Sequence, residues 1–224
     1  MSYRKGVERH GVVADIRADF NRKGTSRMLD WLLRLDERGF VLLNSRLHCG
    51  LLDAIMPAIT TLSNWILPLG LLLLAAICFG GARGRWAVGL ALLAVALSDQ
   101  LSSSLLKNLV ARTRPCHVVD PVRLLVGCSG SFSFPSSHAA NIACAATVFA
   151  GIFPRLIPVL AVLAFLIGYS RVYVGVHYPF DVLAGWTLGL LVGGAIVRLY
   201  HAASEKPSFS FRRNRSRRST SSEV

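Results

Sequence analysis

Nearly all the long apolar runs of this chain lie between residues 51 and 200, and their length constrains the fold more than any other feature. A helix needs about 20 mostly apolar residues to cross roughly 30 Å of hydrocarbon. Hydrophobic residues make up 53% of the 224 residues, a share that is too high for an ordinary soluble domain. We therefore predict an all-α protein that crosses a membrane several times.

The apolar runs predict about five spans, near residues 58–80, 86–108, 136–154, 156–175 and 180–200. The stretch Met28–His48 also has apolar residues at helical spacing, but several charged residues interrupt it. That pattern predicts an amphipathic helix that lies at the membrane interface rather than a further span. The expected fold is thus a polytopic transmembrane helical bundle with an N-terminal interfacial helix.

Both ends of the chain are basic, and the formal net charge is +13. We divide the chain into a basic segment with the interfacial helix at 1–50, a transmembrane domain at 51–200 and a basic tail at 201–224, which we expect to be disordered. Beside a membrane, such flanks favour contact with anionic lipid headgroups or a role in setting the topology. Binding of nucleic acid is disfavoured, because no aromatic stacking pattern or nucleic-acid-binding fold accompanies the charge.

A long loop, residues 109–135, connects the second and third predicted spans. A loop of this length in a compact bundle is usually functional or disordered. Because successive spans run in opposite directions, this loop and the connection between the fourth and fifth spans fall on the same membrane face. The sequence places its most polar residues at these two connections.

Those polar residues form three spaced motifs: Lys107 with Arg114-Pro115, then Pro135-Ser136-Ser137-His138, then Ser170-Arg171 with His177 and Asp181. A phosphoryl group in transfer carries negative charge on its oxygens, so a site without a metal ion needs fixed cations and donors. Lys107, Arg114 and Arg171 would supply that charge. The spacing of Lys107 and Arg114 predicts that one helix continuing past the second span carries both. For each cation alone, the alternative is snorkelling at the end of a span.

The second and third motifs contain the residues suited to bond formation. Pro135 and Ser136 predict a helix start, with Ser136 as N-cap and free backbone N–H groups after it that bind phosphate. His138 then lies in the first helical turn. Asp181, in the first turn of the fifth span, is placed to accept a hydrogen bond from His177, which leaves the other ring nitrogen as a nucleophile.

Together the three motifs resemble the signature of the type 2 phosphatidic acid phosphatase (PAP2) superfamily, which also includes vanadium haloperoxidases. The resemblance covers roughly residues 50–200 and implies that His177 attacks phosphorus, that Asp181 orients it and that His138 protonates the leaving group. It also implies a phosphate-binding set: Lys107, Arg114, Ser136, Ser137 and Arg171. Ser137 departs from the family pattern, which usually has Gly there, and this puts the backbone shape of that loop in question.

The function implied by the resemblance is a membrane phosphatase that acts on a lipid phosphate or diphosphate without a metal or another cofactor. Analogy with compact bacterial members favours undecaprenyl diphosphate, with phosphatidic acid, phosphatidylglycerol phosphate and lipid A phosphate as alternatives. A vanadate-dependent haloperoxidase is disfavoured by the predicted membrane spans. A non-enzymatic transporter or lipid-binding protein is disfavoured because it would need no nucleophile, acid and orienting carboxylate.

Other residues leave alternatives open. Asp99 lies inside the second span, where an ionisable group is costly, and it either supports the cations of the site or joins a buried network. Arg112 and His117 occupy the long loop without matching a motif and are candidate substrate contacts. Cys116 and Cys128 form either a disulfide or two thiols. The basic ends make opposite demands on topology, and the bacterial analogy places this multi-pass protein in the inner membrane with its site outside the cytoplasm.

Overall fold

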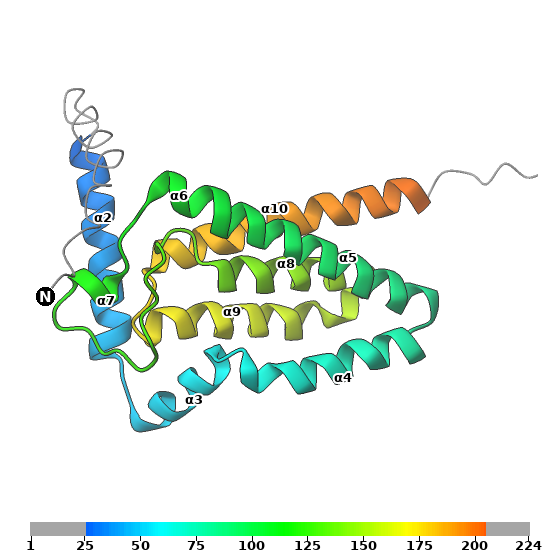
Figure 1. The fold of residues 1–224 in the computed structure, drawn as a ribbon, viewed down its shortest axis with the longest axis horizontal. Coiled ribbons are helices and arrows are strands. Elements are labelled where there is room, and N and C mark those ends of the chain that lie inside the picture. The colour runs from blue at the N-terminus through cyan, green and yellow to red at the C-terminus, as the bar shows by residue number, and fades with distance from the viewer. Residues whose placement is uncertain (1–25, 205–224) are drawn as a thin grey trace, which may run out of the picture.

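A computed structural model describes residues 26–204, and every regular element in this part of the chain is helical. This confirms the predicted all-α class. The helices that run along the long axis of the molecule are α4 (Ser63–Phe79), α5 (Gly81–Asp99), α8 (Ser137–Ile152), α9 (Ile157–Tyr173) and α10 (Pro179–Ser204) (Figure 1). Each of them overlaps one of the predicted spans. Residues 1–25 and most of the predicted basic tail, from residue 205 onward, lie outside the described residues.

The number of spans is lower than the predicted five when length and composition are the criterion. Three stretches, Gly81–Val118, Pro154–Tyr173 and Pro179–Ser204, are long and apolar enough to cross a membrane. Helix α3 (Gly50–Thr60) and helix α4 meet at a short break with a bend of 58° between them, and they give a fourth candidate span if the pair is counted as one span. Helix α8 has only 16 residues, fewer than the about 20 that a span needs. Because α8 packs against α5, α9 and α10, its apolar residues are covered by protein.

Helix α2 (Ser26–Val41) continues into the π-helical turn η1 (Leu42–Arg46), and the pair lies across one end of the bundle (Figure 1). The predicted helix at 28–48 is thus present. One of its faces carries Asp36, Phe40 and Asn44, each at most 1% exposed, at the four-residue spacing that puts side chains on one side of a helix. The other faces of α2 and η1 expose large apolar side chains: Met28, Trp31, Leu35 and Leu42. Its location at a membrane interface stays a prediction.

Glycines on α10 determine how closely this helix approaches α8. Gly185, Gly189 and Gly193 recur every four residues and face α8, and small residues at this spacing let two helix backbones come together. A Cβ atom added at Gly189 would lie 2.8 Å from the Cβ of Ala143. A Cβ atom added at Gly185 would lie 2.5 Å from the carbonyl oxygen of Ser136, at the start of α8. The contact therefore holds the beginnings of α8 and α10 side by side.

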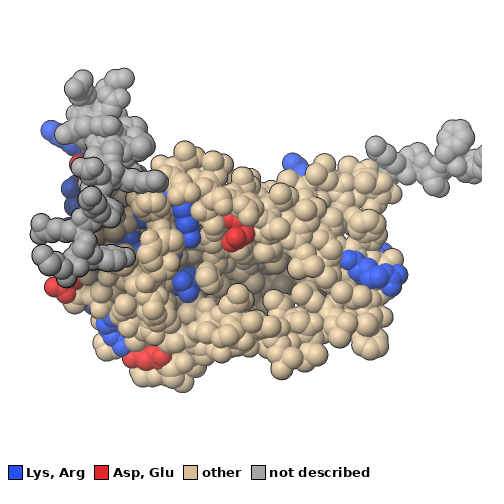
Figure 2. Space-filling view, in the orientation of Figure 1, with Lys and Arg blue, Asp and Glu red and all other residues tan. Residues whose placement is uncertain are grey.

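The outer surface of the bundle is apolar. Helix α4 has no buried residue and exposes several leucines and isoleucines: Ile66, Leu67, Leu71, Leu72 and Leu74. Figure 2 shows an uncharged surface along most of the long axis, with Lys, Arg, Asp and Glu side chains gathered mainly toward the end that carries α2. Such a distribution suits contact with hydrocarbon along the helices and with water or headgroups at the ends.

The chain between α5 and α8 contains η2 (Gln100–Leu106), α6 (Lys107–Val110) and α7 (Pro115–Val118), followed by an irregular loop. The prediction that one helix carries both Lys107 and Arg114 is wrong, because α6 ends at Val110 and Arg114 has an extended backbone. The proline that follows Arg114 explains the difference, since the residue before a proline is disfavoured in the helical conformation.

Candidate active site

The residues of the three motifs meet at the end of the bundle that carries α2. Lys107 begins α6, Ser136 precedes α8, Arg171 lies in the last turn of α9 and Asp181 lies in the first turn of α10. His177 lies in the turn between α9 and α10. The backbone N–H of Ser136 donates to the carbonyl oxygen of Asp181 at 2.9 Å, which ties the second motif directly to the third.

The His177 side chain is almost fully buried between a cation and a carboxylate. Its Nε2 atom lies 3.2 Å from Nη1 of Arg114, and its Nδ1 atom lies 3.5 Å from Oδ2 of Asp181. Burial lowers the pKa of His177 to about 4, although the nearby carboxylate opposes this shift. The ring is therefore uncharged at neutral pH. With its proton on Nδ1, facing Asp181, the ring keeps on Nε2 the lone pair that a nucleophile needs.

The Asp181 carboxylate is held from several directions. Its Oδ1 accepts a hydrogen bond from Nη1 of Arg112 at 2.8 Å. Its Oδ2 accepts the backbone N–H of Tyr178 at 2.9 Å and the hydroxyl of Ser133. The 3.5 Å separation from His177 is longer than a normal hydrogen bond, and Nδ1 of the ring has no hydrogen-bond partner within residues 26–204. Asp181 is thus fixed beside the ring without forming the predicted hydrogen bond in this structure.

Three cations, Lys107, Arg114 and Arg171, lie within electrostatic reach of one another, and Arg114 contacts the imidazole. Lys107 is 9% exposed and Arg114 is 4% exposed, and in the described part of the chain neither they nor Arg171 form an ion pair with a carboxylate. Arg114 donates through Nε to the carbonyl oxygen of Ser131 at 2.8 Å, and Arg171 donates through Nη1 to the hydroxyl of Thr60 at 2.5 Å. Buried cations without a carboxylate are costly unless an anion joins them. The cluster therefore suits a bound phosphate group.

The start of α8 adds neutral donors to this cluster. Ser136 occupies the N-cap position, as predicted, but its hydroxyl makes no capping bond and is buried without a partner within residues 26–204. The first backbone N–H groups of a helix have no partner inside the helix and attract anions. His138, in the first turn of α8, is exposed and lies near the charged groups of the site. The hydroxyl, the N–H groups and His138 are thus available to a phosphate ester.

Asp99 joins a polar network that reaches the same place. Its Oδ1 accepts hydrogen bonds from Nδ2 of Asn141 at 3.0 Å and from the hydroxyl of Ser103 at 3.4 Å. The Ser103 hydroxyl lies 2.9 Å from the hydroxyl of Ser137, a predicted phosphate contact. Ser103 belongs to the π-helical segment η2, and such segments are frequent at functional sites. Asp99 thus joins a partly buried network and also lies within electrostatic reach of Lys107, so the structure is compatible with both alternatives left open for it.

Two residues that sequence reasoning missed, Asp36 and Thr60, hold parts of the site. Arg112, treated above as a candidate substrate contact, joins Asp181 to Asp36 on α2. Thr60, the last residue of α3, accepts the hydrogen bond from Arg171. Asp36 could have been found from the sequence, because a charged residue on the buried face of an amphipathic helix needs an oppositely charged or hydrogen-bonding partner. Thr60 left no signal, since threonine at the end of a helix is common.

A family model described as the PAP2 superfamily matches residues 87–205, which is more than half of the 224 residues and includes all three motifs. The chain belongs to the PAP2 superfamily. It is accordingly a membrane lipid phosphatase of the PAP2 type. The matched residues begin inside α5, so α2, α3 and α4 lie before the PAP2 match.

Curated relatives and a solved structure agree with this PAP2 assignment. Phosphatidylglycerophosphatase B of Bacillus subtilis (strain 168) is 38% identical over 154 residues, which cover 63% of this chain and 71% of the relative. An undecaprenyl-diphosphatase of Sulfolobus acidocaldarius is 42% identical over 84 residues, which cover 37% and 41%. The crystal structure of a transmembrane PAP2-type phosphatidylglycerolphosphate phosphatase from Bacillus subtilis is similar with a TM-score of 0.63 at 29% identity, covering 88% of this chain and 95% of that one.

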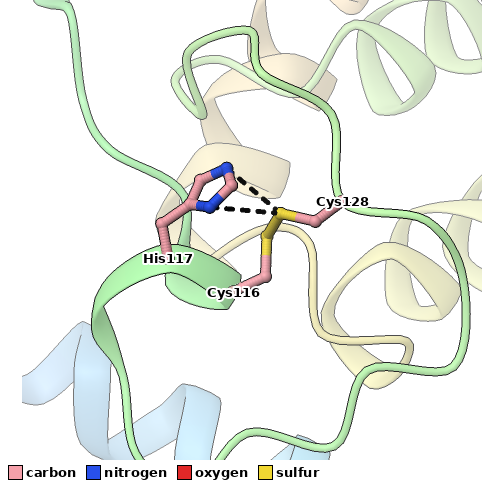
Figure 3. Close-up of side chains that lie close together, drawn as sticks. All are labelled: Cys116, His117 and Cys128. Carbon is pink, nitrogen blue, oxygen red and sulfur yellow. Dashed lines mark hydrogen bonds between the residues drawn. A yellow bond between two sulfur atoms is a disulfide. The ribbon is translucent and has the colours of Figure 1, made fainter. Parts of the chain in front are cut away.

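The loop of this PAP2 protein is closed by a disulfide between Cys116 and Cys128, whose Cα atoms are 6.4 Å apart (Figure 3). The disulfide is thus the alternative that the structure supports. His117 points toward it, with Nε2 3.3 Å from the Cys128 sulfur and 3.3 Å from the carbonyl oxygen of Ser129. These three side chains are the only group in residues 26–204 close enough to share a metal ion, and the disulfide removes the two thiols as ligands.

Proposed function

We propose that this protein hydrolyses the terminal phosphate of a membrane lipid through a covalent phosphohistidine at His177, with side-chain cations in the place that metal ions take in other phosphatases. The observation that carries the proposal is the cluster of Lys107, Arg114 and Arg171, which lacks a carboxylate ion-pair partner in the described part of the chain and contacts a neutral imidazole through Arg114. A site built only to bind an anion would gain nothing from a buried neutral nucleophile.

The reaction has two steps. Nε2 of His177 attacks phosphorus, the bond from phosphorus to the leaving oxygen breaks, and His138 donates a proton to that oxygen. Desolvation and the neighbouring cations lower the pKa of His138 to about 3 in the free site, so the ring takes up this proton when the negatively charged phosphate binds. Water then attacks the phosphohistidine, His138 takes the proton from water, and the bond from phosphorus to nitrogen breaks to release phosphate. The three cations stabilise the charge on the equatorial oxygens in both steps, and Asp181 stabilises the positive charge that develops on the His177 ring.

The substrate class that we place first is a lipid phosphomonoester, with phosphatidylglycerol phosphate as its first member. The relative whose name gives that substrate is 38% identical over 154 residues, whereas a lipid A 4'-phosphatase of Porphyromonas gingivalis is 32% identical over 180 residues and the undecaprenyl-diphosphatase matches over only 84. Undecaprenyl diphosphate, the first choice from sequence alone, is the alternative. An alkoxide leaving group needs a donated proton more than a phosphate leaving group does, so a dedicated acid at His138 also favours the monoester.

The test is a panel of lipid phosphates assayed with the purified protein in detergent. We expect release of phosphate from phosphatidylglycerol phosphate at a higher kcat/KM than from undecaprenyl diphosphate, phosphatidic acid or lipid A phosphate. Activity should survive a chelator, and vanadate, which mimics pentacoordinate phosphorus, should inhibit. Loss of activity with the chelator and recovery with a divalent metal would contradict the proposed chemistry. Higher kcat/KM for undecaprenyl diphosphate would leave the chemistry intact and replace the substrate.

The site is proposed to face an oxidising compartment outside the cytoplasm. The disulfide between Cys116 and Cys128 supports this orientation, because disulfides persist in such compartments and are rare in the cytosol. Thiol labelling of intact cells tests it. We expect these two cysteines to react with an impermeant reagent only after an impermeant reductant has been added. Labelling that requires permeabilised membranes and no reductant would place the site in the cytoplasm.

A further inference from the structure

Arg112 has an unusually complete set of partners for a side chain that belongs to none of the three motifs. One of its terminal nitrogens, Nη1, lies 2.8 Å from Oδ1 of Asp181, and the other, Nη2, lies 2.7 Å from Oδ2 of Asp36. Its guanidinium carbon lies 3.8 Å from the centre of the Tyr178 ring, which is within the range of a cation–π contact. The whole guanidinium group is therefore engaged by protein groups rather than directed at a substrate.

Asp36 holds this arrangement from the other side. It lies on α2, is 1% exposed, and accepts the backbone N–H of Phe180 through Oδ1 at 2.8 Å. Phe180 directly precedes Asp181 in the first turn of α10. One buried carboxylate thus binds both the peptide next to Asp181 and the guanidinium that binds Asp181. The planar fork of arginine can span two carboxylates in this way, whereas the point charge of lysine cannot.

The position of Asp181 depends on these contacts. Its Oδ2 must remain beside Nδ1 of His177, now 3.5 Å away, to stabilise the ring when it attacks phosphorus. Arg112 is the partner of the opposite oxygen, Oδ1, and so limits rotation of the carboxylate about its last bond. Removing Arg112 would leave a buried oxygen without its charged partner, and the carboxylate would turn to find another.

We propose that Asp36 and Arg112 are positioning residues that fix the Asp181 carboxylate for catalysis, so that helix α2, which lies before the residues matched to the family, completes the active site. This inference rests on the proposed role of His177 as nucleophile. Neither residue touches the reacting atoms. Their contribution is to keep the orienting carboxylate in place, which affects the rate of bond formation rather than the binding of phosphate.

Three variants test the link: Arg112→Gln, Arg112→Lys and Asp36→Asn. With phosphatidylglycerol phosphate and with 4-nitrophenyl phosphate, we expect Arg112→Gln to lower kcat about 10- to 100-fold, the range seen when a group that orients a ligating residue is removed. The KM and the inhibition constant for vanadate should stay within about twofold. Arg112→Lys should recover part of the loss. Asp36→Asn, whose amide oxygen can still accept the Phe180 N–H, should lower kcat in the same way.

A double variant shows whether Asp36 and Arg112 act on Asp181 through each other or independently. In the double variant Asp36→Asn with Arg112→Gln, the loss of kcat should be clearly smaller than the product of the two single losses. The matched control is Arg123→Gln, because Arg123 lies in the same loop and pairs with Asp53 on α3 at 2.6 Å without contacting Asp181. We expect that control to change kcat less than about threefold, since this pair is partly open to solvent, where ion pairs contribute little, and Arg123 forms no ion pair with Asp181.

The outcomes separate this inference from the proposed function. A kcat for Arg112→Gln within twofold of wild type, or a loss no greater than that of Arg123→Gln, would overturn the positioning role. A raised KM and vanadate constant with unchanged kcat would overturn it too and make Arg112 a phosphate contact. Wild-type turnover that does not depend on His177 would instead refute the proposed function. Vanadate binding and the thermal unfolding midpoint show whether each variant is folded. If Arg112→Gln is not folded, the kcat of Asp36→Asn tests the positioning role instead.

Discussion

Residues 26–86 and residues 87–204 of this protein bury polar groups for different purposes. In the later region, which the family model matches, the buried polar residues include the proposed nucleophile His177, the proposed orienting carboxylate Asp181 and several serines, together with the cations Lys107 and Arg114. In the earlier region, the buried polar side chains contact the later region instead. Asn44 donates to the carbonyl oxygens of Tyr173 and Arg123 at 2.7 and 2.8 Å, and Thr60 accepts a hydrogen bond from Arg171 at 2.5 Å.

The difference suggests that the later region supplies the residues proposed to react with phosphate, whereas the earlier region holds them in position. A buried polar group needs a hydrogen-bond partner, and the partners of Asp36, Asn44 and Thr60 are the loop, the turn and the helix ends that carry the site. The earlier region therefore acts as a support for residues that the later region supplies. Variants in the two regions should therefore differ in the size and the kind of their effects on kcat, phosphate binding and stability.

The largest effect is expected for the nucleophile. His177→Ala should reduce kcat by at least about 10⁴-fold, because no other group can form the bond to phosphorus. His138→Ala should lose as much with a lipid phosphate but less with 4-nitrophenyl phosphate, whose leaving group needs little protonation. Steady-state kinetics with both substrates gives the comparison, and vanadate binding serves as the folding control. Near-wild-type rates in both variants would contradict the mechanism.

A smaller effect, on phosphate binding, is expected when the contact between Thr60 of the earlier region and the cation Arg171 is removed. Thr60→Val removes the acceptor that Arg171 uses, and a hydrogen bond to a charged group contributes about 1.5–3 kcal/mol. We expect the vanadate inhibition constant to rise about tenfold or more. Thr61→Val is the matched control, because the Thr61 hydroxyl, directly after α3, donates to the carbonyl oxygen of Pro57 and to no other group in residues 26–204. Equal vanadate constants in the two variants would show that Arg171 does not depend on α3.

The earlier region should also influence the protonation of His177. Burial lowers the pKa of His177 to about 4 from an ordinary 6.5, and Met56 of α3 packs in the cluster that includes Val174 and Val176 beside it. Met56→Ala should admit water and raise this pKa by up to about one unit, while the charges of Asp181, Arg114 and Arg171 stay in place. Because the protonated ring cannot attack, the acid limb of kcat should move to higher pH. An unshifted limb in the pH profile would show that α3 does not exclude water.

The smallest effect on turnover, and a clear effect on stability, is expected from helix packing. Gly189→Ala would place a Cβ 2.8 Å from the Cβ of Ala143, whereas Gly70→Ala on α4 would meet nothing within 4 Å. Overpacking costs about 1–3 kcal/mol, so Gly189→Ala should lower the thermal unfolding midpoint in detergent. Gly70→Ala should leave the midpoint unchanged or raise it slightly, because alanine favours the helix. The same midpoint for both variants would mean that α8 and α10 are not closely packed.

Several features of the fold and site were predictable because they depend on local sequence. Apolar runs long enough to form helices predicted α4, α5, α8, α9 and α10, and alternation of direction predicted that Lys107, His138 and His177 would lie at one end. The number of spans was predicted less well. The short α8 and the bend after α3 depend on what surrounds each helix, and a run of apolar residues does not state whether lipid or protein will cover it.

The helical class, the order of the helices and the residues suited to phosphoryl transfer follow from the amino-acid sequence, because helix formation and motif spacing depend on a few neighbouring residues. The contacts of Asp36 with Arg112 and Phe180, and of Thr60 with Arg171, are visible only in the folded protein. Asp36 is one of the charged residues that interrupt the apolar pattern of Met28–His48, whereas in the structure its side chain faces inward. Contacts between residues 76 to 144 positions apart depend on how whole helices pack, and no local pattern encodes that geometry.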